Sequence, residues 1–281
     1  MKKLLITGAS GFLGSKIIEV YKDGYCILAP THSEMDITNE LSVKQYFSTY
    51  KPDIVIHCAA ISDTGRCQRE PELSHLVNVT GSKNIAIAAK LFKSKCIMCS
   101  SDQVYCGSQK DTPNSESDLL EPYNIYGKDK AYTEISCLEL NPDTVHLRLA
   151  WMYDSKATAD STRNDFLKQL KHIILYSQEL SLPINDTRGI TDVWDVVENL
   201  SNTFELPGGV YNFGSSNEKS TYETAFSIFK TLEYDTTLLK KITYDKPRNL
   251  SMSQTKINHF GIYFPTTEDQ LTHCLKEVFH E

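Results

Sequence analysis

Two patterns of apolar and polar positions alternate through the first half of the chain. Short apolar runs bounded by turn residues predict strands at Lys3–Thr7, Tyr25–Ala29, Asp53–Cys58, Lys95–Ser100 and Thr144–Leu149. Between them, apolar residues recur every three or four positions, which predicts helices at Phe12–Lys22, Asn39–Tyr50, Pro71–Phe92 and Ile125–Leu140. Strands that alternate with helices are typical of βαβ units. We therefore expect an α/β fold with a Rossmann-type, doubly wound parallel sheet.

The pattern changes after Ala150. A polar stretch at Asp154–Asp165 precedes predicted helices at Phe166–Gln178, Val193–Phe204 and Thr221–Leu232 and a predicted strand at Val210–Phe213. We expect residues 1–153 to form the sheet domain and residues 154–281 to form mainly a small C-terminal lobe. Part of the second half, at about 187–215, is expected to return to the first domain.

Composition and charge exclude several classes of protein. The chain of 281 residues has a formal net charge of -7, which argues against a nucleic-acid partner. No run approaches the roughly 20 apolar residues of a membrane span, and the apolar run at Leu4–Ile6 is too short for a signal peptide. Eight cysteines without such a signal indicate reduced thiols, so we expect a cytoplasmic protein without a membrane partner.

One cysteine pair has the spacing of a metal or redox motif. Cys96 and Cys99 are three positions apart in a predicted strand, where odd spacing directs two side chains to opposite faces. We therefore expect no metal site there.

A glycine pattern follows the first predicted strand. Gly8, Gly11 and Gly14 stand where that strand meets the next helix, with Ser10, Phe12 and Leu13 between them. Such a turn lets a dinucleotide pyrophosphate approach the backbone at a helix N-terminus. A glycine-rich turn without a ligand is the alternative, but the strand-turn-helix context favours binding of NAD or NADP.

The end of the second predicted strand bears on the choice of cofactor. Residues 29–33 contain neither an acidic residue for a ribose 2′-hydroxyl nor an arginine for a 2′-phosphate. Because no carboxylate repels a 2′-phosphate there, NADP is favoured over NAD. Asp36 and Ile37 are expected near the adenine, although Asp36 also reads as an N-cap of the following helix.

Tyr126 and Lys130 are spaced to share one face of a predicted helix. An ammonium near a phenol lowers the pKa of the phenol, which suits proton transfer to or from a carbinol oxygen. Ser100 and Ser101 end the fourth predicted strand, at the sheet edge where ligands of parallel sheets gather. The alternative is two solvated side chains on a helix surface.

The motifs resemble those of extended short-chain dehydrogenases/reductases, and most closely the dTDP-4-dehydrorhamnose reductase (RmlD-like) family of sugar-nucleotide-binding proteins. The resemblance spans nearly the whole chain and is carried mainly by residues 7–14, 52–60, 70–72, 78–81, 100–105, 122–130 and 147–153. It implies that Ser101 binds the substrate oxygen, that Tyr126 is the acid or base, and that Lys130 activates Tyr126 and binds the ribose. Ala59 and Ala60 are expected at the cofactor.

The same resemblance suggests substrate contacts. Trp151 stands where the family places an aromatic residue against the sugar nucleotide, although a core tryptophan is the alternative. Arg188 and Arg248, together with Arg163 and Lys246, are candidates for the substrate diphosphate, because arginine pairs well with phosphate oxygens. For each of them a solvated surface charge is the alternative.

Asp102 and Gln103, which we also expect at the substrate, separate this chain from its relatives. Related 4,6-dehydratases have an Asp-Glu pair here, and the reductases usually have a tyrosine at the position of Gln103. Gln103 cannot ionise, so it cannot serve as a base for elimination. The particular sugar is therefore open.

The resemblance implies NAD(P)H-dependent reduction of a nucleotide-activated 4-keto sugar, as in dTDP-rhamnose biosynthesis. Two alternatives stay open: an NADP-binding regulatory subunit resembling the methionine adenosyltransferase beta subunit, and a nucleotide-sugar epimerase. Fold alone does not separate them. The expected partner is a nucleotide-sugar substrate, with a homodimer left open.

Overall fold

The computed structural model describes residues 1–158, 161 and 163–279, which divide into two compact units. The first unit comprises residues 1–106, 120–148 and 197–211, and the second comprises residues 107–119, 149–196 and 212–281. We expected a boundary near residue 153, with a segment at about 187–215 returning to the first domain. The structure assigns residues 197–211 to the first unit, and it assigns residues 107–119 and 149–153 to the second.

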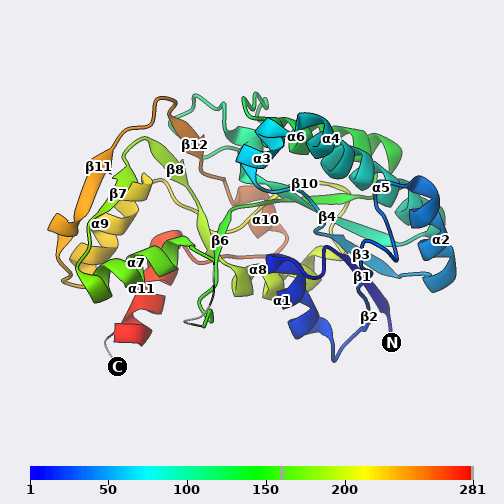
Figure 1. The fold of residues 1–281 in the computed structure, drawn as a ribbon, viewed down its shortest axis with the longest axis horizontal. Helices are drawn as coiled ribbons and strands as arrows, with labels where there is room; N and C mark the ends of the chain where they lie inside the picture. The colour runs from blue at the N-terminus through cyan, green and yellow to red at the C-terminus, as the bar shows by residue number, and fades with distance from the viewer. Residues whose placement is uncertain (159–160, 162, 280–281) are drawn as a thin grey trace. The chain divides into compact units, whose positions relative to one another are not determined.

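A six-stranded sheet is the centre of the first unit (Figure 1). Its order is β10-β5-β4-β3-β1-β2. The bounds are β1 (Lys3–Thr7), β2 (Cys26–Leu28), β3 (Ile54–His57), β4 (Lys95–Ser101), β5 (Val145–Leu149) and β10 (Gly209–Phe213). The strand β1 pairs in parallel with both β2 and β3, so the strand order reverses at β1. In open α/β sheets, ligands bind at the carboxyl ends of the strands that flank such a reversal.

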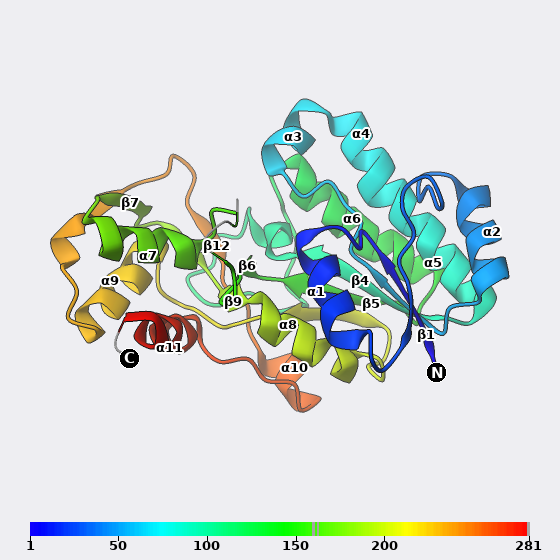
Figure 2. The same ribbon diagram turned by 60° about the horizontal axis from the view of Figure 1, so that its bottom comes forward.

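Helices cover both faces of this sheet, which confirms the doubly wound Rossmann-type fold. The helices are α1 (Phe12–Tyr21), α2 (Glu40–Tyr50), α3 (Thr64–Arg69), α4 (Pro71–His75), α5 (Gly81–Phe92) and α6 (Ile125–Leu140). Figure 2 shows α2, α5 and α6 on one face and α1 on the other. The face under α2 and α5 buries an apolar core that includes Leu5, Val55, Phe47, Ile85 and Met98.

The predicted helix Pro71–Phe92 is continuous but not regular. A π-helical segment, Leu76–Thr80, lies between α4 and α5. Within it, the Asn78 side chain accepts a hydrogen bond from the Ile61 amide (2.8 Å) and donates one to the Ile61 carbonyl (3.0 Å). Such wide turns are common at functional sites, and the apolar periodicity does not reveal them.

The second unit is built from three two-stranded sheets and several helices. The pairs are β6 (Trp151–Tyr153) with β9 (Ile190–Asp192), β7 (Leu180–Pro183) with β11 (Leu239–Ile242), and β8 (Asp186–Arg188) with β12 (Arg248–Leu250). The helices are α7 (Phe166–Tyr176), α9 (Thr221–Thr231), α10 (Thr255–His259) and α11 (Thr267–Phe279). Figure 1 shows α7, α9 and α11 together, and their buried residues form one core with Phe166, Leu170, Ile228, Phe229 and Leu271.

The chain also contains several shorter helical segments. Helix α8 (Val193–Asn199) leads into a 3-10 turn, Leu200–Thr203, and further 3-10 turns are Asp102–Tyr105 and Thr236–Leu238. In the first unit, the Tyr21 hydroxyl of α1 donates to the Val197 carbonyl (3.0 Å) and accepts from the Ser201 amide (2.8 Å). Within the described residues, no helix is long and apolar enough to cross a membrane.

One local alternative was wrong. Asp36 does not cap the second helix, because Asn39 accepts hydrogen bonds from the amides of Leu41 (3.0 Å) and Ser42 (3.1 Å). The Asp36 carboxylate instead accepts from the Thr38 amide (2.9 Å) and hydroxyl (2.7 Å), which closes a local turn before the helix.

Candidate active site

The glycine loop is held in close contact with neighbouring backbone. Gly8 has a φ of +66°, and a Cβ there would lie 2.7 Å from the Ala59 nitrogen. A Cβ at Gly14 would lie 2.3 Å from the Gly8 carbonyl oxygen. These positions need glycine for steric reasons within the fold. Gly11 differs, because its φ of -76° is ordinary and its nearest neighbour would be 3.1 Å away.

A cavity of about 310 Å³ opens beside this loop. Four of the predicted cofactor residues, Gly8, Ser10, Ile37 and Ala59, line it. The other lining residues are Thr7, Ala9, Ala29, Pro30, Thr31, His32, Met35, Thr38 and Val77. It lies at the carboxyl ends of β1 and β3, where the strand order reverses. A mostly apolar cavity beside a glycine turn and a helix N-terminus fits the adenosine half of a nicotinamide dinucleotide.

Other predicted cofactor residues lie outside the cavity lining. Gly11, Phe12, Leu13 and Gly14 form the N-terminal end of α1, and the Leu13 side chain is buried. Asp36 and Ala60 do not line the cavity. The loop backbone, rather than the side chains of Phe12 and Leu13, is therefore the part suited to a pyrophosphate.

The loop after β2 carries a carboxylate, Glu34, just beyond residues 29–33. Glu34 accepts hydrogen bonds from the Thr31 amide (2.7 Å) and hydroxyl (2.8 Å), and these bonds hold its pKa below the ordinary value. Thr31 lines the cavity, and neither lysine nor arginine does. The argument for NADP from a missing carboxylate is thus weakened, and the residues fit NAD as well as NADP.

Ser101, Tyr126 and Lys130 come together in the first unit. Ser101 ends β4, and Tyr126 and Lys130 lie in the first turns of α6. Their exposed fractions are only 9%, 8% and 5%. Ser101 is hydrogen-bonded to the Tyr126 hydroxyl, and the Lys130 ammonium donates to the Cys99 carbonyl at 2.7 Å. The Lys130 nitrogen is 5.7 Å from the centre of the Tyr126 ring.

Burial controls the protonation of this group. It raises the pKa of Tyr126 well above the ordinary value, and the hydrogen bond with Ser101 offsets only part of the rise. Burial also lowers the pKa of Lys130. We expected Lys130 to lower the pKa of the phenol, but the shift has the opposite sign because burial disfavours the phenolate. Tyr126 is therefore a protonated phenol at neutral pH.

Two residues that the sequence reasoning overlooked position α6. Asn124 caps the helix by accepting from the Gly127 amide (2.7 Å), and its side-chain nitrogen donates to the Gln103 side-chain oxygen (3.1 Å). A Cβ at Gly127 would lie 2.4 Å from the Gln103 carbonyl oxygen. The glycine directly after Tyr126 was a usable signal, because it lets the helix approach the strand end that carries Ser101.

A buried ion pair supports the same strand end. Arg148 of β5 donates to the Glu134 carboxylate of α6 at 3.0 and 2.6 Å, and both side chains are 3% exposed. Ser100 donates to Glu134 at 2.5 Å, and Arg148 also bonds the Tyr105 hydroxyl at 2.5 Å. Such networks join residues far apart in sequence, so spacing did not predict this one.

The remaining predicted substrate residues of this strand end are also buried. Asp102 accepts from the Ser101 hydroxyl at 3.1 Å, and its exposed fraction is 2%. Gln103 is 7% exposed.

In the second unit, Trp151 and Arg188 form a contact of their own. The Arg188 guanidinium lies 5.0 Å from the centre of the Trp151 ring, in a cation–π arrangement. Trp151 also contacts the Phe166 ring, with the two ring centres 5.7 Å apart. Arg163 donates to the Met152 carbonyl at 3.3 Å. Trp151 is thus half-buried at the margin of the core of this unit.

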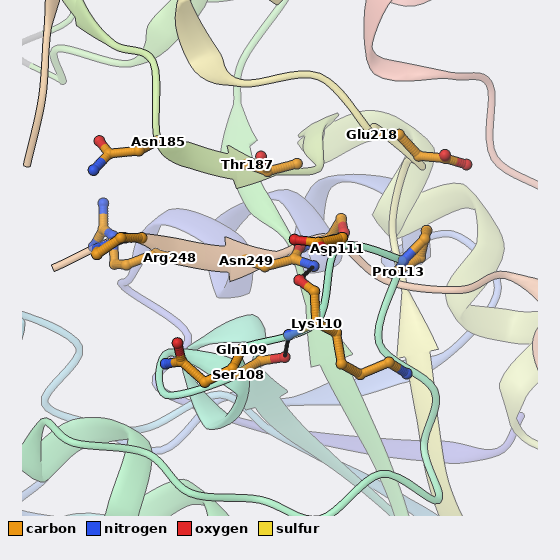
Figure 3. Close-up of a pocket in the computed structure, with 12 residues that line it drawn as sticks. Ser108, Gln109, Lys110, Asp111, Pro113, Asn185, Thr187, Glu218, Arg248 and Asn249 are labelled. Atoms are coloured by element: carbon orange, nitrogen blue, oxygen red, sulfur yellow. Dashed lines mark hydrogen bonds between the residues drawn. The ribbon is translucent and has the colours of Figure 1, made fainter.

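Arg248 lines a different hollow of the second unit. Figure 3 shows Arg248 and Asn249 of β12 beside Asn185 and Thr187, above the loop that carries Lys110. The hollow has a volume of about 280 Å³. Arg248 donates to the Asp186 carboxylate at 2.8 Å, which neutralises much of its charge. Lys246 is not among the lining residues.

The cysteines of the Cys96-x-x-Cys99 segment lie on opposite faces of β4. Cys96 is buried in the apolar core, whereas the Cys99 sulfur lies 3.5 Å from the Cys58 sulfur. In the part of the chain that the structure describes, no group of three or more His, Cys, Asp or Glu residues is arranged to hold a metal ion.

Known proteins share this architecture. A dTDP-4-dehydrorhamnose reductase of Bacillus anthracis, solved in complex with NADP, superposes with a TM-score of 0.84 at 25% identity, over 99% of both chains. The dTDP-4-dehydrorhamnose reductase of Aggregatibacter actinomycetemcomitans is 30% identical over 285 residues, which cover 93% of this chain and 94% of that protein. Methionine adenosyltransferase 2 subunit beta of Xenopus laevis is 27% identical over 282 residues, which cover 93% and 83%.

A family model also matches this chain. The RmlD substrate binding domain model matches residues 1–279, almost the entire chain. The chain therefore belongs to the RmlD substrate binding domain family.

Proposed function

We propose that this protein is an NAD(P)H-dependent oxidoreductase that reduces the keto group of a nucleotide-activated 4-keto sugar, in the manner of dTDP-4-dehydrorhamnose reductase. The observation that carries the proposal is the buried group of Ser101, Tyr126 and Lys130 in the same unit as the glycine loop. The relatives named as reductases and the NADP complex of one of them support the choice of chemistry.

The residues have separable roles. A bound NAD(P)H supplies a hydride. Tyr126 holds a phenolic proton, which its raised pKa keeps in place until a more basic alkoxide forms beside it. Ser101, hydrogen-bonded to that phenol, orients the substrate oxygen, and Lys130 is held by the Cys99 carbonyl at a position suited to the ribose and the developing phenolate.

Gln103 favours reduction over elimination. Its side-chain oxygen accepts a hydrogen bond from Asn124, and an amide does not ionise near neutral pH, so it cannot serve as a general acid or base. We therefore expect no dehydration of dTDP-glucose. Mass spectrometry of that reaction checks this directly, and a product lighter by one water would retire the reductase proposal.

A panel of 4-keto nucleotide sugars, incubated with NADH or NADPH and followed by absorbance, tests the activity. Stoichiometric oxidation of the cofactor is the expected result, and the two cofactors compared give the preference. Turnover without net oxidation would instead indicate epimerisation. A protein that binds the cofactor but is inactive across the panel would favour a regulatory role. We consider that role because one relative is named as a methionine adenosyltransferase subunit.

A further inference from the structure

Two cysteines meet at the carboxyl end of the sheet, beside the cofactor cavity. The recorded pairing of β3 with β4 ends with His57 opposite Met98, so Cys58 and Cys99 are the next residues in register. Their sulfur atoms are 3.5 Å apart. Adjacent strands are about 4.8 Å apart, a Cα separation that lies within the range of disulfide-bonded cysteines.

Cys58 and Cys99 differ from the buried cysteines in residue exposure and in the pKa of one thiol. Cys58 and Cys99 are each partly exposed, whereas Cys67, Cys96, Cys106, Cys137 and Cys274 are buried. The hydrogen bond from Cys58 and the nearby Lys130 ammonium lower the pKa of the Cys99 thiol. A thiol with a lowered pKa holds more of the thiolate that attacks disulfides.

The backbone of this pair is shared with the cofactor site. Ala59 follows Cys58, lines the cavity, and donates its amide to the Thr7 hydroxyl at 3.2 Å. The Cys58 carbonyl carbon would be 2.9 Å from a Cβ at Gly8, so this segment packs directly on the glycine loop. The Cys99 carbonyl accepts the Lys130 ammonium.

We propose that Cys58 and Cys99 are an oxidant-reactive dithiol, which a small-molecule disulfide converts to an intramolecular disulfide that weakens cofactor binding. This goes beyond the proposed reductase activity. An S–S bond of about 2.05 Å draws the two sulfurs together from 3.5 Å. We expect this closer approach to shift the Cys58–Ala59 segment, which packs on Gly8.

The exchange balances with oxidised glutathione as the oxidant. The Cys99 thiolate attacks one glutathione sulfur, forms a mixed disulfide and releases one glutathione thiolate. Cys58 then loses its proton and attacks the Cys99 sulfur, which releases the second glutathione. The two cysteines lose two electrons and two protons, and the glutathione disulfide is reduced to two thiols.

Peptide mass spectrometry tests the linkage. The full chain is first incubated with oxidised glutathione, and the remaining thiols are then alkylated. The expected result is a linked pair of peptides that contain Cys58 and Cys99, reversed by dithiothreitol. The exposed Cys26 gives a matched control, because Cys26→Ser is expected to form the same link. Cys58→Ser and Cys99→Ser are expected to lose it.

Calorimetric titration with NADPH and NADH tests the consequence. We expect the oxidised wild type to bind about tenfold more weakly than the reduced wild type, the size of effect of one lost hydrogen bond. Oxidant-treated Cys99→Ser, which lacks the attacking thiolate, is expected to bind as its untreated form does. A wild type without the Cys58–Cys99 link after treatment would overturn the proposal, and so would a linked protein with unchanged affinity. Neither result depends on which sugar the protein reduces.

Discussion

At the scale of single residues, burial sets the charge states in the first unit. It keeps Tyr126 protonated, and it lowers the pKa of His57 and of His146 to about 3. His57 is satisfied by Thr7 (2.7 Å) and Ser82 (3.0 Å), whereas the His146 Nε2 has no hydrogen-bond partner among the described residues. Both histidines are therefore neutral in the folded protein throughout the physiological pH range.

These histidines predict a pH dependence of stability. Their folded pKa lies below the unfolded value, so the unfolded state binds more protons, and stability is complete above pH of about 6.5 and declines as the pH falls toward 3. Between pH 6.5 and 5, each histidine costs about 2 kcal/mol. His146→Leu should remove about half of the decline that the pair causes. Urea unfolding of both proteins at the two pH values measures it, and equal declines would contradict the assignment to His146.

Gly11 gives a second test at this scale. Its backbone conformation and surroundings leave more room than those of Gly8 and Gly14, so Gly11→Val should fold, while the side chain blocks the approach of a pyrophosphate. We expect NAD(P)H affinity to fall by about 10²-fold or more, because a displaced pyrophosphate loses several hydrogen bonds. Calorimetry measures it, with Gly24→Val as the control, since a Cβ there has a neighbour no closer than 4.0 Å. Equal affinities in the two variants would remove the loop from the cofactor site.

At the scale of elements, helix α6 is held by contacts from several directions. Asn124 caps it, Gly127 lets it approach the Gln103 backbone, and Glu134 joins it to β5 through Arg148. These contacts fix the helix that carries Tyr126 and Lys130 against the strand that ends at Ser101. The packing of α6 against β4 and β5 therefore fixes the position of the candidate site within this unit.

Substitutions in the ion pair of Glu134 and Arg148 measure how this packing affects the free energy of unfolding. Arg148→Met leaves a buried carboxylate without its partner, so we expect the free energy of unfolding to fall by about 3–5 kcal/mol. The double variant Glu134→Leu with Arg148→Met removes both charges and should recover most of that loss. Denaturant unfolding compares them. A double variant less stable than the single variant would show that the ion pair itself, rather than the unpaired charge, dominates.

At the scale of the whole molecule, the sequence predicted the first unit far better than the second. Strands such as Lys3–Thr7 and helices such as Ile125–Leu140 were predicted with their observed bounds, because each is long enough to show its period. The paired strands of the second unit have only three or four residues, as in Asp186–Arg188, and no alternation is legible over that length. Helices α3, α10 and α11 were also overlooked.

The residues of the candidate site were likewise only partly predictable from the sequence. Gly8, Ser101, Tyr126 and Lys130 could be named because their motifs are local, and the structure brings the last three together. Contacts between distant segments, such as Arg148 with Glu134 or Cys58 with Cys99, depend on strand order and could not be read from spacing. The sign of the Tyr126 pKa shift also depends on burial, which the motif does not give.

In the function that we propose, Tyr126 donates the proton of the reduction. Tyr126→Phe removes one hydroxyl and keeps the ring, so turnover of the 4-keto sugar that the panel identifies should fall by about 10²- to 10⁴-fold while NAD(P)H affinity stays close to wild type. Tyr132→Phe, on the exposed face of the same helix, is the matched control and should keep full activity. Steady-state turnover and calorimetric affinity of the three proteins decide it. Wild-type turnover in Tyr126→Phe would show that Tyr126 is not the proton donor.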